Sequence, residues 1–186
     1  MRLLPFFIFL PLAAGLFTAL LERRLKYISD ILAIGSTFGL AFAAGKASLM
    51  VQGHRALSYP LGGWGYPLGL NLVLDGFSGL MLVMVNSVSF LVMVYALSYM
   101  RGYTEKWKFH TLFMLMLAGM NGVLLSSDLF SLYVFLELAA LCGYVLVAFG
   151  IEEVSLEAAF KYLIMGVMAS VGILLSIGLL YSYTSA

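Results

Sequence analysis

Charged side chains are scarce in this chain: they make up 10% of its 186 residues, whereas soluble domains carry about 25%. Cysteine and histidine are scarcer still, with one and two residues. The single cysteine, Cys142, excludes an internal disulfide, and with two distant histidines it provides no metal-site spacing and no haem or iron–sulfur motif. The sequence also has no nucleophile–base pair or phosphate loop, and therefore predicts no catalytic site of its own. A net charge of +1 gives no reason to expect a nucleic-acid partner.

Hydrophobic residues make up 63% of the chain. They form runs of about 20 residues, the length that crosses a bilayer as a helix. The sequence predicts an all-α integral membrane protein in which residues 1–186 form a single membrane domain with about six transmembrane helices. The predicted spans lie near residues 3–21, 31–51, 76–100, 111–126, 129–149 and 158–181.

The segment between the second and third spans, residues 52–75, has a different composition. Its glycines and prolines indicate turns. Leu70, Leu72 and Leu74 then alternate with other side chains, which is typical of a strand. We predict a short extracellular β-hairpin here, whose aromatic residues suit the lipid headgroup level. The alternative is an ordinary interfacial loop. The aromatic residues are Tyr59, Trp64 and Tyr66.

Basic residues near the predicted span ends favour one orientation. Three lie on the side of the N-terminus and six on the opposite side, so the positive-inside rule makes the opposite side cytoplasmic. Both termini then face outward from a multi-pass protein of the cell (inner) membrane. The first set is Arg2, Lys46 and Arg55; the second is Arg23, Arg24, Lys26, Arg101, Lys106 and Lys108.

Glu137 is the one charged residue in the run 129–149. A charge at mid-bilayer costs roughly 2.5–3.5 kcal/mol on insertion scales and commonly marks an ion or proton path. The alternative is a protonated carboxyl that only bonds helices together. Tyr133 and Tyr144, at −4 and +7, share its helix face. This stripe predicts either a relay of hydroxyls and water or a packed aromatic surface.

Three other ionisable residues are candidates. Lys161 follows Glu157 by four residues, the favourable order for a helical ion pair, and lies about 14 Å in depth from Glu137 by the helical rise. We therefore expect no direct salt bridge between Lys161 and Glu137. His110 suits a proton relay or an interfacial position, and Asp128 suits a helix N-cap or a relay.

Other residues predict helix contacts. Asn86 and Asn121 are expected to hydrogen-bond between helices. Small residues four apart, Gly35 with Gly39 and Gly166 with Ser170, predict close backbone approach.

Two segments resemble a known family. GGWGYPLGLNLVLDGFSGLML (62–82) resembles the external hairpin and third helix of antiporter-like membrane subunits. SSDLFSLYVFLELAALCGYVLVAFG (126–150) and EEVSLEAAFKYLIMGVMAS (152–170) resemble their fifth and sixth helices. The family comprises the antiporter-like subunits of respiratory complex I, membrane-bound hydrogenases and Mrp sodium/proton antiporters. The resemblance covers nearly the whole chain, and the carboxylate-bearing helix with the A-x-K-Y segment is its most specific part.

The resemblance implies a role in ion transport. Glu137 matches the family's proton-channel glutamate, and Lys161 matches a lysine often found near that channel. Family members bind no redox cofactor, so iron–sulfur, flavin or nickel–iron centres would belong to partner subunits. The implied function is coupling of redox chemistry in such partners to proton or sodium transport. The alternatives are an Mrp-type sodium/proton antiporter subunit without a redox partner, and a truncated, non-conducting assembly subunit.

The chain also departs from the family. Members usually have about fourteen helices in two inverted halves, an arrangement common in transporters. This sequence includes neither the broken seventh helix with its central lysine nor the second half. The resemblance therefore implies either that another chain supplies the missing antiporter half or that this chain has a mainly structural role in a larger complex.

Overall fold

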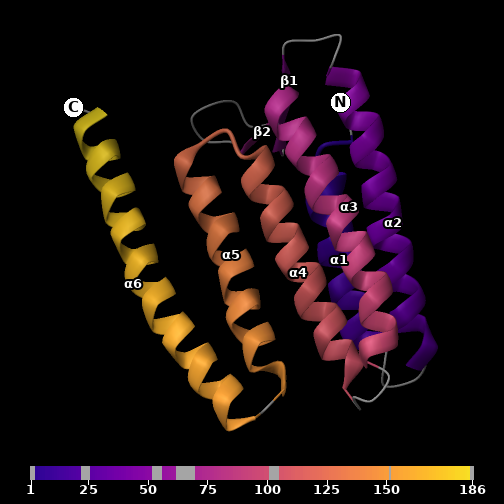
Figure 1. Cartoon of the computed structure of the whole chain (residues 1–186). Coiled ribbons are helices and arrows are strands. Elements are labelled where there is room, and N and C mark those ends of the chain that lie inside the picture. Colours follow the sequence, from indigo (N-terminus) through magenta and orange to yellow (C-terminus); the bar gives the residue numbers. More distant parts are fainter. Residues whose placement is uncertain are drawn as a thin grey trace.

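The computed structural model describes residues 3–21, 26–51, 56–61, 70–100, 105–150 and 152–184. The chain is mostly helical, with one small two-stranded sheet (Figure 1). The elements are α1 (Phe6–Leu21), α2 (Lys26–Val51), β1 (Ala56–Pro60), β2 (Asn71–Asp75), α3 (Gly76–Tyr99), α4 (Lys106–Leu125), α5 (Leu129–Val147), the 3₁₀ turn η3 (Ala148–Gly150) and α6 (Glu153–Thr184).

Five of the helices, α2 to α6, are long and apolar enough to cross a membrane, whereas α1 is a shorter apolar helix of 16 residues. The predicted spans fall on these helices, but several helices extend further. α2 begins at Lys26, α4 at Lys106 and α6 at Glu153, each about five residues before the predicted span. The prediction followed hydropathy, which ends where charged residues begin, whereas the hydrogen-bonded helix continues through them.

The helices form a bundle in which α6, α5 and α4 stand side by side and α1, α2 and α3 gather beyond α4 (Figure 1). α4 is central, because it packs against both α1 and α5. α6 stands at the edge, packed against α5, and diverges from it toward the C-terminal end (Figure 1). Ser170 is therefore one of few buried residues on α6, together with Ala159 and Ile177.

A polar contact joins three helices in the centre of the bundle. Asn121 and Asn86 are fully buried, and each amide donates to the other's Oδ1, at 2.9 and 3.2 Å. The predicted hydrogen bonding between α3 and α4 is confirmed. Asn121 Nδ2 also donates to the Phe7 carbonyl on α1, at 3.0 Å. Pro11 stands four residues after Phe7 and has no N–H for that carbonyl, so Asn121 supplies the donor that the helix lacks.

The predicted strand is confirmed as β2, which pairs with β1 in antiparallel register from Ala56 opposite Asp75 to Pro60 opposite Asn71. Leu72 and Leu74 are each 1% exposed and belong to the main hydrophobic core, with Tyr59 packed against it. This core also includes residues of α1, α2, α3 and α4. Trp64 and Tyr66 lie outside the described residues, as do Arg2, Arg23, Arg24, Arg55 and Arg101.

Two aspartates begin helices at the sheet end of the bundle. Asp75 accepts from the Ser78 N–H at 2.7 Å while its own N–H donates to Ser78 Oγ, which completes a capping box on α3. The Ser78 backbone hydrogen bond is the main cause that lowers the pKa of Asp75. Asp128 caps α5 by accepting from the Ser131 N–H at 2.7 Å, so its predicted N-cap role is confirmed.

The α4–α5 turn is held against the sheet. Ser127 donates through both its N–H and its hydroxyl to the Asn71 carbonyl, at 3.3 and 2.8 Å. Asp128, which begins α5, directly follows this contact. The N-terminal end of α5 and the sheet therefore lie at the same end of the bundle (Figure 1).

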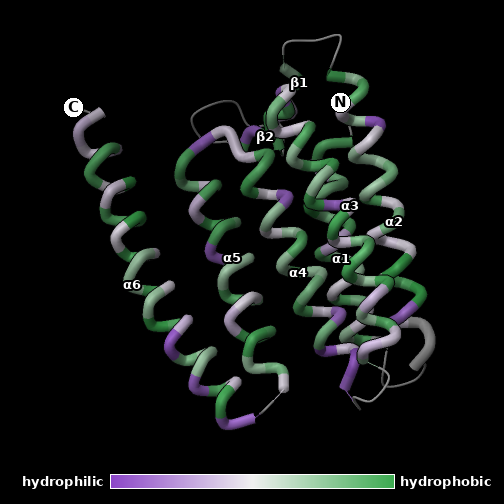
Figure 2. The backbone as a smooth tube through the Cα atoms, in the orientation of Figure 1, coloured by the Kyte–Doolittle hydropathy of each residue, from purple (hydrophilic) through white to green (hydrophobic). Residues whose placement is uncertain are grey.

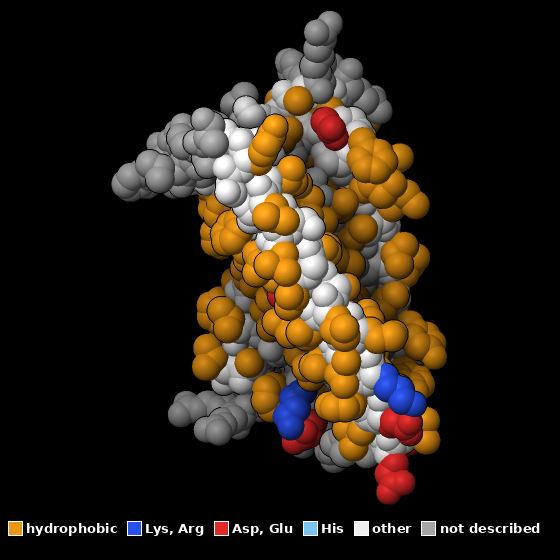
Figure 3. All heavy atoms as spheres, turned by 90° about the vertical axis from the view of Figure 1, so that its left-hand side faces the viewer, with side chains coloured by type: hydrophobic (Ala, Val, Ile, Leu, Met, Phe, Trp, Pro, Cys, Tyr) orange, Lys and Arg blue, Asp and Glu red, His pale blue; other side chains and the backbone are white. Residues whose placement is uncertain are grey.

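The residues along the helices are mainly hydrophobic, and many of the hydrophilic ones lie near the helix ends (Figure 2). Figure 3 shows the face that carries α6, with hydrophobic side chains along its length and charged ones gathered mainly at its lower end. A soluble protein rarely exposes a hydrophobic surface of this extent. The distribution matches that expected of helices in a bilayer, with apolar side chains in lipid and charges at the boundary.

Replacement of Asn121 by Leu should destabilise the bundle, because it leaves the Phe7 carbonyl and the Asn86 amide without their partner. We expect the free energy of unfolding to fall by about 1–3 kcal/mol, which is the usual cost of leaving a buried polar group without a partner. Hydrogen bonds between membrane helices typically fall at the lower end, near about 1 kcal/mol. The measurement is the midpoint of thermal unfolding in detergent.

Thr184→Val is the matched control, because the Thr184 hydroxyl bonds only to carbonyls of its own helix on an exposed surface. Equal midpoints for N121L and T184V would contradict the role assigned to Asn121.

Candidate functional site

Glu137 lies near the middle of the 19-residue helix α5, half-buried, on the side that faces α6. Its Oε2 is 2.5 Å from Ser170 Oγ on α6. Ser170 Oγ is in turn 3.1 Å from Tyr133 Oη, one turn earlier on α5. Ser170 is 6% exposed, so the carboxyl meets a sheltered hydroxyl group, which in turn contacts the Tyr133 hydroxyl.

Tyr144, seven residues after Glu137 on α5, makes a second contact with α6. It is buried, and its ring meets Tyr162 of α6 edge-on, with centroids 4.7 Å apart. Its hydroxyl occupies the place where a Cβ would stand on Gly166. A close backbone approach was predicted at Gly166 and Ser170. The structure places both residues at the contact with α5, but the contacts are made by side chains: the Tyr144 hydroxyl lies at Gly166, and the Ser170 hydroxyl meets the Glu137 carboxyl.

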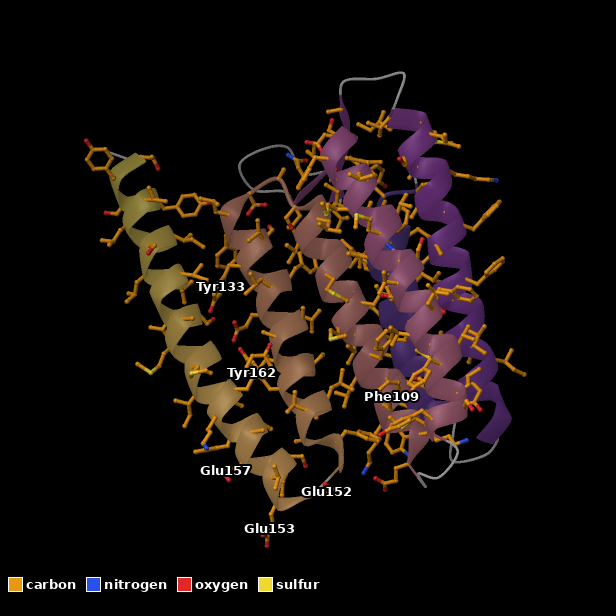
Figure 4. All side chains as sticks on the ribbon, in the orientation of Figure 1. Phe109, Tyr133, Glu152, Glu153, Glu157 and Tyr162 are labelled. Atoms are coloured by element: carbon orange, nitrogen blue, oxygen red, sulfur yellow. The ribbon has the colours of Figure 1, made fainter. Side chains whose placement is uncertain are left out.

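Figure 4 labels Tyr133 and Tyr162 between the ribbons of α5 and α6. Tyr133, Glu137 and Tyr144 all contact α6, as their spacing along one helix face predicts. Tyr133 and Glu137 share one hydroxyl partner, whereas Tyr144 meets a glycine and an aromatic ring. The tyrosines thus have different surroundings: one belongs to a polar contact, the other to aromatic packing.

The opposite side of α5 packs on α4. A Cβ on Gly119 would lie 2.7 Å from the Ala139 backbone nitrogen, and one on Gly122 would overlap the Phe135 ring. Gly119 thus lets α4 approach the backbone of α5, and Gly122 makes room for the Phe135 ring. Close approach was predicted instead at Gly35 and Gly39 of α2, and that prediction is wrong, since no described atom lies within 4 Å of a Cβ built there.

Lys161 does not reach Glu137. Its Nζ is 2.5 Å from Glu157 Oε1, and these two side chains are 70% and 66% exposed. This is the i,i+4 ion pair that the spacing predicts, and Lys161 precedes Ser170 by nine residues, about 13 Å along the helix. Lys161 therefore lies near the start of α6, at the end of the bundle where Figure 4 labels Glu152, Glu153 and Glu157.

His110 belongs to a second polar contact, far along α4 from the turn that leads into α5. It is fully buried, and its Nε2 is 2.9 Å from Asp30 Oδ1 on α2. Its Nδ1 is buried without a hydrogen-bond partner among the described residues. Asp128 stands at the opposite end of the bundle as a helix cap. Neither residue contacts Glu137, so the structure does not bring these two candidate relay residues to the carboxyl.

Two contacts of the candidate residues were not predicted from the sequence: Glu137 with Ser170, and His110 with Asp30. Ser170 was identified only as a small packing residue, and Asp30 was not singled out. The signal for Asp30 was available, because it directly precedes the second predicted span and His110 precedes the fourth, on the same predicted side. The signal for Ser170 was weaker: a polar atom on the sixth span that only a model of helix packing brings to Glu137.

Within residues 3–21, 26–51, 56–61, 70–100, 105–150 and 152–184, no three His, Cys, Asp or Glu side chains come together as metal ligands. The chemistry that the α5–α6 site offers is that of protons. A carboxyl can take up and release H⁺, and hydroxyl groups can both donate and accept hydrogen bonds.

Comparison with known proteins relates these features to a family. Residues 63–110 match the family described as "NADH-Ubiquinone oxidoreductase (complex I), chain 5 N-terminus", and residues 126–186 match "NADH:quinone oxidoreductase/Mrp antiporter, TM". NADH-quinone oxidoreductase subunit N of Desulforudis audaxviator is 37% identical over 92% of this chain and 35% of its own length. A Na(+)/H(+) antiporter subunit of Alkalihalophilus pseudofirmus is 27% identical over 95% of this chain and 36% of its own.

Solved structures have the same fold. A chain of the membrane-bound sulfane sulfur reductase, an archaeal respiratory membrane complex, superimposes with a TM-score of 0.91 at 28% identity, over 100% of this chain and 38% of that one. A chain of the Mrp complex from Dietzia sp. superimposes with a TM-score of 0.87 at 25% identity, over 97% of this chain and 34% of that one. The chain spans about a third of the length of the curated relatives it matches.

Fold, surface and relatives define a multi-pass membrane protein. The chain belongs to the family of antiporter-like membrane subunits found in complex I and in Mrp antiporters.

Replacement of Gly166 by Ala should weaken the α5–α6 contact, because the added methyl group overlaps the Tyr144 hydroxyl and the Tyr144 ring is held against Tyr162. Overpacking of this kind typically costs about 1–3 kcal/mol. The measurement is thermal unfolding of the purified protein in detergent.

Gly172→Ala on the same helix is the control, since nothing described lies within 4 Å of its Cβ. That variant should match or slightly exceed the parent, because Ala favours a helix over Gly by about 1 kcal/mol. A G166A protein as stable as G172A would show that Tyr144 moves away freely.

Proposed function

We propose that this chain is part of an ion-translocating membrane module in which Glu137 takes up and releases a proton. The observation that carries the proposal is the carboxyl at half-height of α5, in contact with Ser170 and sheltered by α6. An ionisable group is costly inside the hydrocarbon region. A mere helix contact needs only a neutral polar residue there, so a carboxyl points to proton chemistry.

In this proposal all six helices cross the cell (inner) membrane as one membrane domain. The β1–β2 hairpin and both termini face outward, and the end of α6 with Glu157 faces the cytoplasm. The apolar outer surface of the helices supports the crossing, and the charges grouped near the Lys161 end support a membrane boundary there.

The module belongs, by this proposal, to an assembly with other membrane subunits, one of which supplies the remaining antiporter half. Redox chemistry takes place in partners that hold iron–sulfur, flavin or nickel–iron centres, and it drives proton or sodium movement here. The relatives named as parts of NADH-quinone oxidoreductase and of a sulfane sulfur reductase complex support this choice.

The second candidate is a subunit of an Mrp-type sodium/proton antiporter that has no redox partner. The Na(+)/H(+) antiporter relative in Alkalihalophilus pseudofirmus and the Mrp complex of Dietzia support it. The two candidates share the proton site at Glu137 and differ in what drives it. The third candidate function, that of a non-conducting assembly subunit, requires no ionisable side chain at position 137.

Glu137→Gln should reduce proton translocation at least tenfold while leaving assembly intact, because the amide keeps the shape and a hydrogen bond to Ser170 but cannot titrate. The measurement is the initial rate of proton uptake by inverted membrane vesicles that carry the complete complex, with the amount of assembled complex determined in parallel.

Glu153→Gln is the matched control, because Glu153 is an exposed carboxylate at the start of α6. Normal transport and normal assembly in E137Q would remove the carboxyl from the pathway and leave the assembly role as the function.

Lys161 is proposed to act on Glu137 at a distance, through its charge. At about 14 Å and an effective dielectric constant near 20, the interaction is at most about 1 kcal/mol. Lys161→Gln should therefore lower the transport rate by no more than about fivefold, and Lys161→Arg, which keeps the charge, should retain the parent rate. A loss in K161Q as large as that in E137Q would contradict action at a distance, and an unchanged rate would limit Lys161 to its surface pair with Glu157.

A further inference from the structure

Ser170 differs from most hydroxyl residues described inside the helices in where its hydrogen bonds go, although Thr18 with Thr111, and Ser36 with Met114, also make contacts between helices. Serines and threonines in helices commonly bond to a carbonyl one turn earlier. In this protein Thr18, Ser36, Thr37, Ser176 and Thr184 all do so. Both hydrogen bonds of Ser170 instead cross to α5, to Glu137 and to Tyr133.

The two contacts of Ser170 constrain each other. A serine hydroxyl has one proton to donate and lone pairs to accept, so it cannot donate to Glu137 and Tyr133 at once. When Glu137 is ionised, its carboxylate only accepts; Ser170 then donates to Glu137, and Tyr133 donates to Ser170. When Glu137 is protonated, the carboxyl donates to Ser170, and Ser170 donates to Tyr133.

We propose that Ser170 is the link of a reversible hydrogen-bond chain, Glu137–Ser170–Tyr133, which passes protons between the carboxyl and the end of α5 near the β1–β2 hairpin. This inference rests on the proposed function of Glu137 and adds the route by which its proton arrives and leaves. Ser170 and Tyr133 serve as relay residues, and the direction in which their hydroxyl groups point follows the protonation state of Glu137.

The chain balances for one proton. A proton from water binds to the Tyr133 oxygen, Tyr133 passes its own hydroxyl proton to Ser170, and Ser170 passes its own to the Glu137 carboxylate. Three O–H bonds form and the corresponding three break, one of them in the donor water. Both hydroxyl groups end neutral and reoriented, and Glu137 ends neutral. Release runs through the same steps in reverse.

The geometry gives the route its direction. Tyr133 precedes Glu137 by four residues, so it lies about 6 Å closer to the start of α5. That start follows the turn in which Ser127 bonds to Asn71 of β2. Tyr133 is half-buried, whereas Ser170 is 6% exposed, so the chain leads from a sheltered hydroxyl toward a more accessible one. Lys161 and Glu157 lie in the opposite direction along α6.

The test measures proton translocation by the complete complex in inverted membrane vesicles, for a set of variants and over a range of pH. Ser170→Ala and Tyr133→Phe each remove one hydroxyl of the chain. Ser170→Thr keeps the hydroxyl and therefore serves as the rescue variant. Ser176→Ala is the matched control on the same helix, because the Ser176 hydroxyl bonds only to its own helix.

We expect S170A and Y133F each to slow translocation about tenfold or more with normal assembly, while S170T and S176A stay within about threefold of the parent. Because both hydroxyls serve one chain, the double variant S170A/Y133F should be little slower than either single variant. The pH dependence supplies a second readout: with the relay broken, proton delivery limits the rate, so the slowing should be greater at high pH, where protons are scarce.

Rates near the parent in S170A and Y133F would overturn the relay. So would equal slowing in S170A and S170T, or multiplicative slowing in the double variant, because either result would indicate loss of packing instead of loss of a proton carrier. Glu137→Gln separates this failure from that of the proposed function: a slow E137Q with fast S170A and Y133F rejects only the relay, whereas a fast E137Q rejects the role of Glu137 itself.

Discussion

A carboxyl group halfway along an apolar helix needs a polar partner, and here that partner comes from the neighbouring helix. Glu137 on α5 meets Ser170 on α6, and α6 has few other buried residues. Gly166 makes the approach possible by leaving room for Tyr144. The packing between α5 and α6 and the polar contact at Glu137 therefore depend on each other: without the close approach the carboxyl would lose its hydroxyl partner.

The rest of the bundle holds α5 in place from the other side. Gly119 and Gly122 let α4 touch the backbone and ring atoms of α5. α4 is itself joined to α1 by Asn121, whose side chain donates a hydrogen bond to the Phe7 carbonyl. Pro11 has no N–H to make this bond within α1. The site thus lies against the packed helices α1, α3 and α4, while α6 stands at the edge of the described bundle (Figure 1).

Local sequence patterns predicted what depends on local physics. The alternation of Leu72 and Leu74 predicted β2, and Asp128 next to an apolar run predicted the N-cap of α5. The spacing of Tyr133, Glu137 and Tyr144 predicted a shared helix face, and Asn86 and Asn121 were correctly expected to join helices. The contacts Glu137–Ser170 and His110–Asp30 were missed, as was the α4–α5 approach at Gly119 and Gly122, because each depends on which helices are neighbours and on their relative rotation, which helical periodicity does not contain.

The central claim is that Glu137 gains and loses a proton in its place between α5 and α6. Infrared difference spectroscopy of the complete complex, recorded between low and high pH, tests it most directly. The account predicts a C=O band of a protonated carboxylic acid that titrates, disappears in Glu137→Gln, and shifts in frequency in Ser170→Ala because a hydrogen bond is lost. A spectrum in which no titrating carboxyl band depends on Glu137 would contradict the account.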